Sequence, residues 1–222
     1  MQKKVALIGA SGFVGSAILD ELLARGWQVE ALVRNPQKVK TQNPNLTVRK
    51  LDVGDEQDLV DALKGYDTVI SAYNPGWTNP DIYRETLENY PKILEAAKKA
   101  RCKRILIVGG AGTLFVAPGL RVVDSGAIPE AIMPAVRSLG EFYLNTLMNE
   151  KGIDWVFFSP AGQLGNPDHT PGERTGKYRL GKDDLIVDAN GKSSISVPDY
   201  AKAMVDELEK PAHHEERFTI GY

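Results

Sequence analysis

The chain has 222 residues, of which 42% are hydrophobic and 25% charged, and its formal net charge is -2. This composition is typical of a soluble globular domain, and the absence of a basic stripe argues against nucleic acid as a partner. The single cysteine, Cys102, excludes an internal disulfide and suits a reducing cytoplasm. No segment approaches the ~20 apolar residues of a membrane span, so we expect a cytoplasmic protein without a membrane partner.

Strand-like apolar runs alternate with helical periodicities along most of the chain. The predicted strands are residues 5–9, 28–36, 46–53, 67–73, 103–110 and 153–160, and the predicted helices are residues 13–26, 55–65, 82–100 and 134–152. Strands that alternate with helices of this length indicate a parallel sheet covered on both faces. Right-handed crossovers then predict an α/β, doubly wound sheet with the strand order 3-2-1-4-5-6-7.

The last fifty residues follow a different pattern. Short apolar runs in residues 178–196 flank Asn190-Gly191, which predicts a hairpin with a type I′ turn. Residues 197–211 predict a helix, and residues 217–222 predict an edge strand. We therefore expect one domain over residues 1–222, in which residues 160–222 contribute a small C-terminal lobe on one side of the cleft.

Three glycines separate the first predicted strand from the first helix, in the stretch VALIGASGFVGSAIL. Gly9 permits a sharp turn, Gly12 lets a phosphate approach the backbone, and Gly15 lets the helix pack closely on the strand. The N–H groups at the start of the helix favour an anion. The predicted ligands of a dinucleotide pyrophosphate are Gly9, Ser11, Gly12, Phe13, Val14 and Gly15. The alternative is a glycine-rich turn without a ligand.

The end of the second strand bears on the choice of coenzyme. No carboxylate is present at this position to accept a hydrogen bond from a ribose hydroxyl. Arg34 occupies the position instead, and Lys38 is nearby. A guanidinium pairs well with a 2′-phosphate, which favours NADP over NAD. If Arg34 is instead a solvated turn residue, NAD stays possible. Asp52 and Val53 end the third strand beside the predicted adenine site, where Asp52 is equally suited to cap a turn.

Several motifs in this order resemble the atypical short-chain dehydrogenase/reductase superfamily: LIGASGFVG, LDVGD, VISAYNPGW, LIVGGAGTL and ISVPDYAKAM. The resemblance covers nearly the whole chain. It is strongest to the branch of NAD(P)H-flavin reductase and biliverdin-reductase-B-like proteins, which are often labelled NAD-dependent epimerase/dehydratase-like. It implies a Rossmann sheet with a nicotinamide dinucleotide across its strand ends. The further coenzyme contacts that it implies are Ser71, Ala72, Tyr73, Gly109, Arg137 and Pro160.

The catalytic positions depart from the superfamily pattern. Common members carry a serine after the fifth strand and a Tyr-x-x-x-Lys pair on the next long helix, and this chain has Ala111, Met133 and Arg137 at those positions. Arginine holds a ribose but is a poor proton relay. We therefore predict Arg137 and the nearest hydroxyl, Thr113, as catalytic residues. The predicted reaction is hydride transfer to a planar small-molecule acceptor, such as a flavin or a quinone, that needs no protein acid.

The acceptor side is less well defined by the sequence. Trp77 and Thr113 are predicted to line the substrate pocket, and Tyr73 and Trp77 either wall it or tuck their loop onto the domain. Tyr143 is interpreted as a packing residue and His169 as an exposed one, and no set of residues has metal-ligand spacing.

Two other functions stay open at this point. One is a coenzyme-binding sensor or scaffold without turnover, which the three altered positions favour. The other is a nucleotide-sugar epimerase or dehydratase, which ranks lowest because that reaction needs the missing tyrosine. The sequence is compatible with a monomer or a homodimer.

Overall fold

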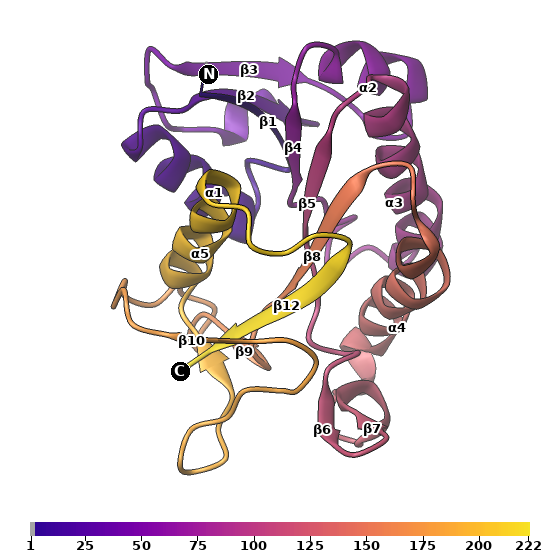
Figure 1. Cartoon of the computed structure of the whole chain (residues 1–222), viewed down its shortest axis with the longest axis vertical. Helices are drawn as coiled ribbons and strands as arrows, with labels where there is room; N and C mark the ends of the chain where they lie inside the picture. The colour runs from indigo at the N-terminus through magenta and orange to yellow at the C-terminus, as the bar shows by residue number, and fades with distance from the viewer. Residues whose placement is uncertain (1–2) are drawn as a thin grey trace.

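A twisted sheet forms the centre of the molecule in the computed structural model, which describes residues 3–222 (Figure 1). Within these residues the sheet has eight strands. In sheet order they are β10 (Arg179–Gly181), β12 (Glu216–Gly221), β8 (Asp154–Ser159), β5 (Arg104–Val108), β4 (Thr68–Ser71), β1 (Lys4–Ile8), β2 (Gln28–Val33) and β3 (Leu46–Lys50). The predicted fold class is confirmed, because the parallel part of this sheet has the predicted order 3-2-1-4-5-6-7.

The outer edge of the sheet differs from the prediction. The last strand, β12, is not an edge strand, because β10 pairs with it in the antiparallel direction and covers its outer side. All other neighbours in the sheet are parallel, as in the pair of β12 with β8. One short antiparallel strand therefore protects the edge of an otherwise parallel sheet.

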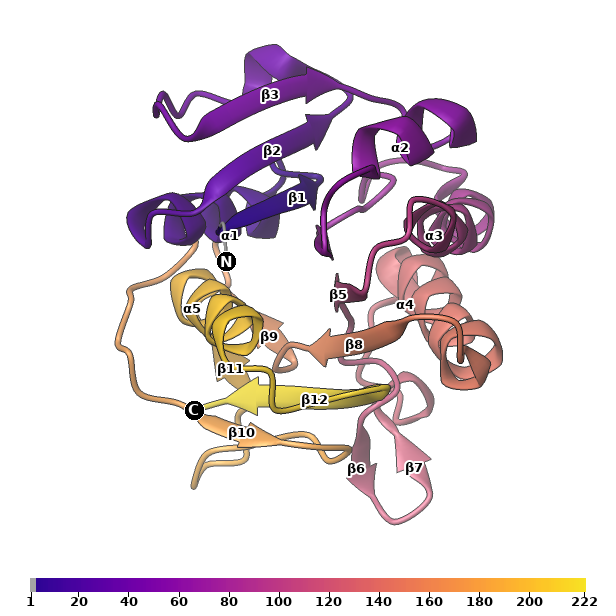
Figure 2. The same cartoon turned by 45° about the horizontal axis from the view of Figure 1, so that its top comes forward.

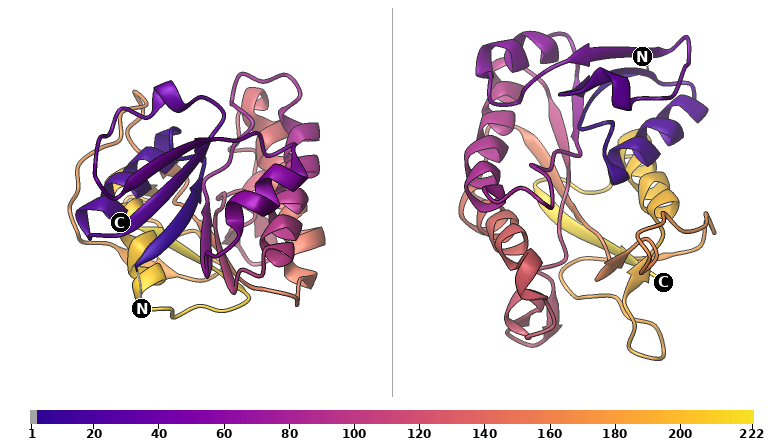
Figure 3. Two further views of the ribbon diagram at one scale, coloured as in Figure 1. Left: turned by 90° about the horizontal axis from the view of Figure 1, so that it is seen from above. Right: turned by 180° about the vertical axis from the view of Figure 1, so that it is seen from behind.

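Helices cover both faces of the sheet. α1 (Phe13–Ala24) and α5 (Val197–Glu209) lie on one face, and α2 (Glu56–Leu63), α3 (Ile82–Lys99) and α4 (Met133–Glu141) lie on the other (Figures 2 and 3). Each face of the sheet has its own hydrophobic core, and successive residues of a strand pack in alternate cores. In β5, Ile105 packs in the core that contains Tyr90, and Leu106 packs in the core that contains Tyr200. Burial on both faces explains why the strands are almost uninterrupted apolar runs.

The predicted hairpin at Asn190-Gly191 is wrong. A type I′ turn needs positive φ at both central residues, but Gly191 has φ 77° and Asn190 is not among the residues with positive φ. The Asp188 carboxylate instead accepts hydrogen bonds from the amides of Asn190 and Lys192, at 2.8 and 2.9 Å. The flanking segments also pair elsewhere: β10 joins β12, and β11 (Ser194–Ile195) joins β9 (Gln163–Leu164).

The helix predicted over residues 134–152 is shorter and less regular. α4 ends at Glu141, and a π-helical turn, Phe142–Thr146, and a 3-10 turn, Leu147–Asn149, follow it. Upstream, the long crossover after β5 contains a small hairpin of β6 (Phe115–Ala117) and β7 (Leu120–Arg121) that was not predicted. In the described part of the chain, no helix has the length and apolar character needed to cross a membrane.

Asp199, which is fully buried in the first turn of α5, anchors the C-terminal lobe. Its carboxylate accepts hydrogen bonds from the Gly176 amide at 2.8 Å, the Thr175 amide at 3.1 Å and the Tyr222 hydroxyl at 2.7 Å. Burial raises the pKa of this carboxyl, but these hydrogen bonds outweigh burial and hold the pKa below its ordinary value. The segment between β9 and β10, which runs past α1 and α5 (Figure 2), is thereby fixed to the Rossmann core.

Candidate functional site

The predicted site residues gather at the carboxyl edge of the sheet, where strands β1, β2, β3, β4, β5 and β8 end. The strand order reverses between β1 and β4, which lie side by side with Ile8 opposite Ser71. In open α/β sheets, ligands bind outside the carboxyl ends of the strands at such a reversal. The glycine turn after β1 therefore lies at the position where the fold favours a ligand.

Gly9 and Gly15 allow β1, α1 and β4 to approach one another. Gly9 has φ 80°, and a Cβ built on it would lie 2.5 Å from the carbonyl oxygen of Ala72. A Cβ on Gly15 would overlap the carbonyl oxygen of Gly9. Both contacts involve backbone atoms, which cannot rotate away as a flexible side chain can. The structure thus confirms that Gly9 makes the turn and that Gly15 permits close packing of the helix.

Gly12 has different surroundings. It caps the N-terminus of α1 with extended backbone angles, φ -81° and ψ 174°, and no side chain caps the helix. A Cβ here would meet only the Gly9 carbonyl oxygen, at 3.4 Å. Side chains therefore leave the first-turn amides of Phe13, Val14 and Gly15 without an acceptor, as an anion-binding helix start requires.

Two serine hydroxyls near this edge are buried without a partner among the described residues. Ser71 ends β4 and is 1% exposed, and Ser159 ends β8 and is fully buried, yet neither Oγ has a hydrogen bond. Buried hydroxyls are normally paired because an unpaired one loses its hydration without compensation. Ser71 lies opposite Ile8, next to the glycine turn, so its orphaned hydroxyl fits a ligand that enters between β1 and β4.

Arg34 follows β2 with its side chain exposed. Its guanidinium donates one hydrogen bond, from Nη2 to the carbonyl oxygen of Pro75 at 3.3 Å, and it forms no ion pair within residues 3–222. Lys38, in the 3-10 turn Pro36–Lys38, is also exposed. Arg34, the residue predicted to bind the 2′-phosphate, therefore still has hydrogen-bond donors that can bind an anion.

Asp52 and Val53, the two residues predicted to lie beside adenine, have different surroundings. The Asp52 carboxylate accepts a hydrogen bond from the Gly54 amide at 2.9 Å, so it caps the turn before α2, which was one of the two interpretations of this residue. Val53 is 5% exposed and packs in the core, so it can face a ligand mainly through its backbone.

Tyr73 and Trp77 do not share one environment. Tyr73 is buried, its ring meets Tyr90 edge to face, and its hydroxyl accepts a hydrogen bond from Asn89 at 2.7 Å. Burial raises the pKa of this tyrosine. Trp77 is 62% exposed. Of the two rings predicted to wall an acceptor pocket, only Trp77 is available to stack on a planar molecule.

The structure corrects the prediction for Thr113. Its side chain is buried, and its Oγ1 accepts a hydrogen bond from Arg217 Nη1 at 2.8 Å. A hydroxyl held in this way is poorly placed to exchange a proton with a ligand or to line a pocket. Arg137, on the exposed side of α4, makes no hydrogen bond or ion pair in the part of the chain that the structure describes. It stays a predicted ligand of the coenzyme.

The interpretation of Tyr143 as a packing residue is confirmed. It is 5% exposed and lies in the π-helical turn, where its ring stacks on Phe157 with a centroid distance of 4.6 Å. Burial raises the pKa of its hydroxyl, which makes it a weaker acid.

Gly109 and Pro160 are two further residues predicted to contact the coenzyme. At Gly109 the Phe157 ring approaches the backbone, since a Cβ there would lie 2.7 Å from the ring. Pro160 is buried one residue beyond β8.

Arg217 and Asp183 were not predicted from the sequence. Arg217 lies in β12, buried, and donates from Nη2 to the Asp183 carboxylate at 2.6 Å. The sequence signal for this pair was Arg217 itself, which lies at an inward position of the run RFTIGY. In an edge strand, as predicted, such an arginine would reach solvent and need no partner. Because β12 is an inner strand, that arginine needs the counter-charge that the 182–187 loop supplies.

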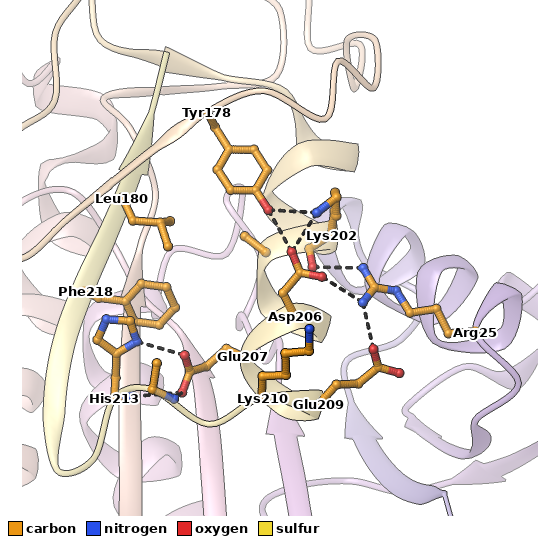
Figure 4. A pocket seen from close by; sticks show the side chains of 12 residues that line it. Arg25, Tyr178, Leu180, Lys202, Asp206, Glu207, Glu209, Lys210, His213 and Phe218 are labelled. Carbon is orange, nitrogen blue, oxygen red and sulfur yellow. Dashed lines mark hydrogen bonds and ion pairs between the residues drawn. The ribbon is translucent and has the colours of Figure 1, made fainter.

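A cavity of about 500 Å³, whose lining side chains are drawn in Figure 4, lies beyond the C-terminal end of α1. It is lined by Arg25, Asp206 and Glu209 on one side and by Leu180 and Phe218 on the other. Arg25 caps the C-terminal end of α1, so the length of that helix, about 18 Å, separates the cavity from the turn. Several charges in it are paired with one another, as in the 2.8 Å ion pair of Arg25 with Asp206. The residues predicted to bind the coenzyme do not line this cavity.

Residues 9–211 match the protein-family model described as NAD(P)H-binding. The chain belongs to this NAD(P)H-binding family. The match begins at Gly9, the first glycine of the turn, and extends into the C-terminal lobe. It confirms the resemblance to the NAD(P)-binding, atypical short-chain dehydrogenase/reductases that the sequence motifs indicated. No group of three or more potential metal-ligating side chains occurs within residues 3–222.

Three relatives of this NAD(P)H-binding chain span nearly its whole length. The protein named uncharacterized protein YwnB of Bacillus subtilis (strain 168) is 39% identical over 219 residues, which are 98% of this chain and 97% of that protein. The structure of a candidate epimerase from Bacteroides thetaiotaomicron is 58% identical, with a TM-score of 0.93 and coverage of 100% and 98% of the two chains. A candidate NADH-flavin reductase from Streptococcus pneumoniae TIGR4 is 33% identical, with a TM-score of 0.84 and coverage of 99% of each chain.

Proposed function

We propose that this protein is a cytoplasmic NADPH-dependent reductase that transfers hydride to a planar small-molecule acceptor, such as a flavin or a quinone. The observation that carries the proposal is the pairing of a built dinucleotide turn with the loss of the superfamily's proton relay. The turn presents free amides at the start of α1 beside the buried, unpartnered Ser71 hydroxyl. The relay positions hold Ala111, Met133 and Arg137.

The coenzyme fits the donors at this edge. The amides of residues 13–15 suit the pyrophosphate, and Arg34 suits the 2′-phosphate that distinguishes NADP from NAD. Arg137 has free donors for the nicotinamide ribose, and Ser71 has an unused hydroxyl. When bound, NADPH supplies the hydride. The protein's part is to hold the two reacting rings in register and to exclude water between them.

The nature of the acceptor follows from the groups that are missing. Methionine transfers no proton, and arginine stays protonated, so no side chain at the relay positions can act as an acid. A flavin or a quinone accepts hydride at a conjugated ring and takes its proton from solvent. A simple ketone requires protonation of the new alkoxide by a nearby acid. The name of the Streptococcus pneumoniae relative agrees with a flavin acceptor.

The name of the Bacteroides thetaiotaomicron relative suggests a different reaction. Epimerisation of a nucleotide-sugar by this superfamily uses the tyrosine that Met133 replaces here. The same substitution favours a second candidate function, a coenzyme-binding sensor that performs no turnover. Hydride transfer to flavins or quinones separates the reductase from both alternatives.

The test is steady-state oxidation of NADPH with a panel of flavins, quinones and UDP-sugars. We expect NADPH consumption with at least one planar acceptor and none with the sugars. Binding of NADPH without turnover across the panel would assign the protein to the sensor class. Conversion of a UDP-sugar would mean that another residue provides the missing acid and would overturn the proposal.

A further inference from the structure

The α2–α4 face of the sheet is incompletely covered by helices. On this face α4 packs over the inner strands, while β12 and β10 are covered by the loop of residues 182–187. Ile186 lies directly on the backbone there: a Cβ built on Gly221 would be 2.9 Å from the Ile186 Cβ, and one on Gly181 would be 3.2 Å from the Ile186 Cδ1. This loop therefore takes the place of a helix.

Arg217 projects from β12 beneath that loop. Its side chain is 4% exposed. Nε and Nη2 donate to the Asp183 carboxylate at 3.1 and 2.6 Å, and Nη1 donates to Thr113 Oγ1 at 2.8 Å. The guanidinium also lies 4.9 Å from the centre of the Tyr143 ring. One buried cation thus joins β12, the 182–187 loop, the π-helical turn and the loop that follows β5.

The loop after β5 and the 182–187 loop are also joined through their backbones. The Phe115 amide donates to the Asp183 carbonyl at 2.9 Å, and the Leu185 amide donates to the Phe115 carbonyl at 2.8 Å. Thr113 in turn lies against α4, because a Cβ on Gly140 would be 3.0 Å from the Thr113 methyl group. The two loops therefore form one rim, and Arg217 fixes its inner side.

We propose that Arg217 is a positioning residue: through Thr113 and Asp183 it holds the loop of residues 109–115 in the place where that loop meets the nicotinamide end of the coenzyme. The inference rests on the proposed reductase function. Arg217 touches neither coenzyme nor acceptor. It sets the alignment of the two reacting rings, to which hydride transfer is sensitive, and leaves the pyrophosphate turn between β1 and α1 unaffected.

The test compares Arg217→Met and Arg217→Lys with Arg104→Met. Arg104 is a matched control, since it is also buried and also bonded to a carboxylate, Glu207 at 2.6 Å, but it begins β5 at the opposite edge of the sheet. For each variant we would measure NADPH affinity by calorimetry, kcat and KM with flavin, and the isotope effect of deuterium at the transferred position.

In Arg217→Met we expect kcat to fall about ten- to a hundredfold while NADPH affinity changes less than about twofold. The isotope effect should rise, because a misaligned hydride step becomes rate-limiting. Arg217→Lys should restore part of kcat. Arg104→Met should lose stability without a change in kcat or in the isotope effect.

Thr113→Val keeps the shape of its side chain and removes only the hydroxyl, so it tests the same contact if Arg217→Met does not fold. The kcat of Thr113→Val should fall. Because both substitutions affect the same contact, the kcat of the Thr113→Val, Arg217→Lys double variant should be no lower than that of the less active single variant. Equal kcat losses in Arg217→Met and Arg104→Met, or an unchanged isotope effect in Arg217→Met and Thr113→Val, would overturn the positioning role. A wild-type protein that binds NADPH but reduces no acceptor would instead overturn the proposed function, and the inference with it.

Discussion

The two edges of the sheet hold their charges in different ways. At the amino edge, the buried Arg104 side chain is bonded to Glu207 at 2.6 Å and lies 3.1 Å from Asp154. At the carboxyl edge, Arg34 and Arg137 are exposed and form no ion pair within the described residues. The amino edge therefore pairs its buried arginine with carboxylates, and the carboxyl edge leaves its exposed arginines and the amides at the start of α1 available.

This difference separates stability from ligand binding. A buried ion pair leaves an uncompensated charge when one partner is removed, so its loss destabilises the fold. An exposed cation without a partner contributes little to folding. Substitution of Arg104 should therefore change stability and not coenzyme affinity, and substitution of Arg34 or Arg137 should change coenzyme affinity and not stability. Gly9 and Gly15, where backbones are in contact, should affect both quantities.

The largest expected effect is at the amino edge. Arg104→Met leaves the carboxylate of Glu207 buried without its cation, so the free energy of unfolding should fall by about 3–5 kcal/mol. Urea unfolding measures this change. NADPH affinity of the folded variant should match that of the wild type. A folded Arg104→Met protein that binds NADPH poorly would remove the distinction between the edges.

Gly15→Ala should have the next largest effect. Its new Cβ would overlap the Gly9 carbonyl oxygen, so β1 and α1 must separate, at a cost of about 1–3 kcal/mol. Gly12→Ala is the matched control, because its Cβ has 3.4 Å of space and the loss of a glycine cap costs less than about 1 kcal/mol. Thermal unfolding of both variants compares them. Equal destabilisation would show that the three glycines do not have separate roles.

Arg34→Met sharpens the comparison at the carboxyl edge. Loss of a charged hydrogen bond to the 2′-phosphate should weaken NADPH binding by about 1.5–3 kcal/mol, or roughly ten- to a hundredfold, and leave NADH binding unchanged. Lys64→Met, which removes an exposed cation at the C-terminal end of α2, is the control. Calorimetric titration with both coenzymes measures the effect. An equal loss of NADPH and NADH affinity would assign Arg34 to another part of the ligand.

The smallest expected effect is the acid response of Glu209, near the amino edge. Burial raises the pKa of this carboxyl, but hydrogen bonds from Trp27, Lys3 and Arg25 outweigh burial and lower the pKa to about 2. Because the folded-state pKa is lower than the ordinary 4.5, its stabilising contribution is present above that value and is lost as the pH falls towards about 2.

Glu209→Gln should therefore lower stability at neutral pH, where the contribution of the ionised carboxylate is fully present, and flatten the decline of stability over that acid range. Unfolding curves recorded at a series of pH values measure the slope. An unchanged slope in Glu209→Gln would mean that other carboxylates account for the acid response.

The sequence predicted the parts of the fold that depend on local pattern. The apolar run of β1, Val5–Ile8, and the amphipathic helices gave the class and the order of the parallel strands. The errors of the sequence prediction concern strand pairing between distant segments. Nothing in residues 178–196 shows that β10 pairs with β12 at the end of the chain and not with a strand within the same segment. The π-helical turn after Glu141 was equally hidden, since it accompanies the burial of both Phe142 and Tyr143 in the core.

The same limit applies to the site. Gly9 and Gly15 could be predicted because the steric demands of a strand–turn–helix are local. Thr113 was misplaced because its hydroxyl is held by Arg217, which is distant in sequence. Tyr73 was predicted either to wall the cleft or to tuck its loop onto the domain, and its packing on Tyr90, which depends on how α3 lies over the sheet, could not be predicted. Residue type predicted which groups can bind a coenzyme, but only the fold determines which of them are free to do so.

The most direct test of the central claim is a calorimetric titration of the wild-type protein and Gly12→Ala with NADPH and NADH. Free amides at the start of α1, open to a ligand because Gly12 has no side chain, should give the wild type micromolar affinity for NADPH. Gly12→Ala, although folded, should bind at least about tenfold more weakly, because its Cβ occupies the path of the phosphate. No heat with either coenzyme, or equal affinity in the two proteins, would contradict the account.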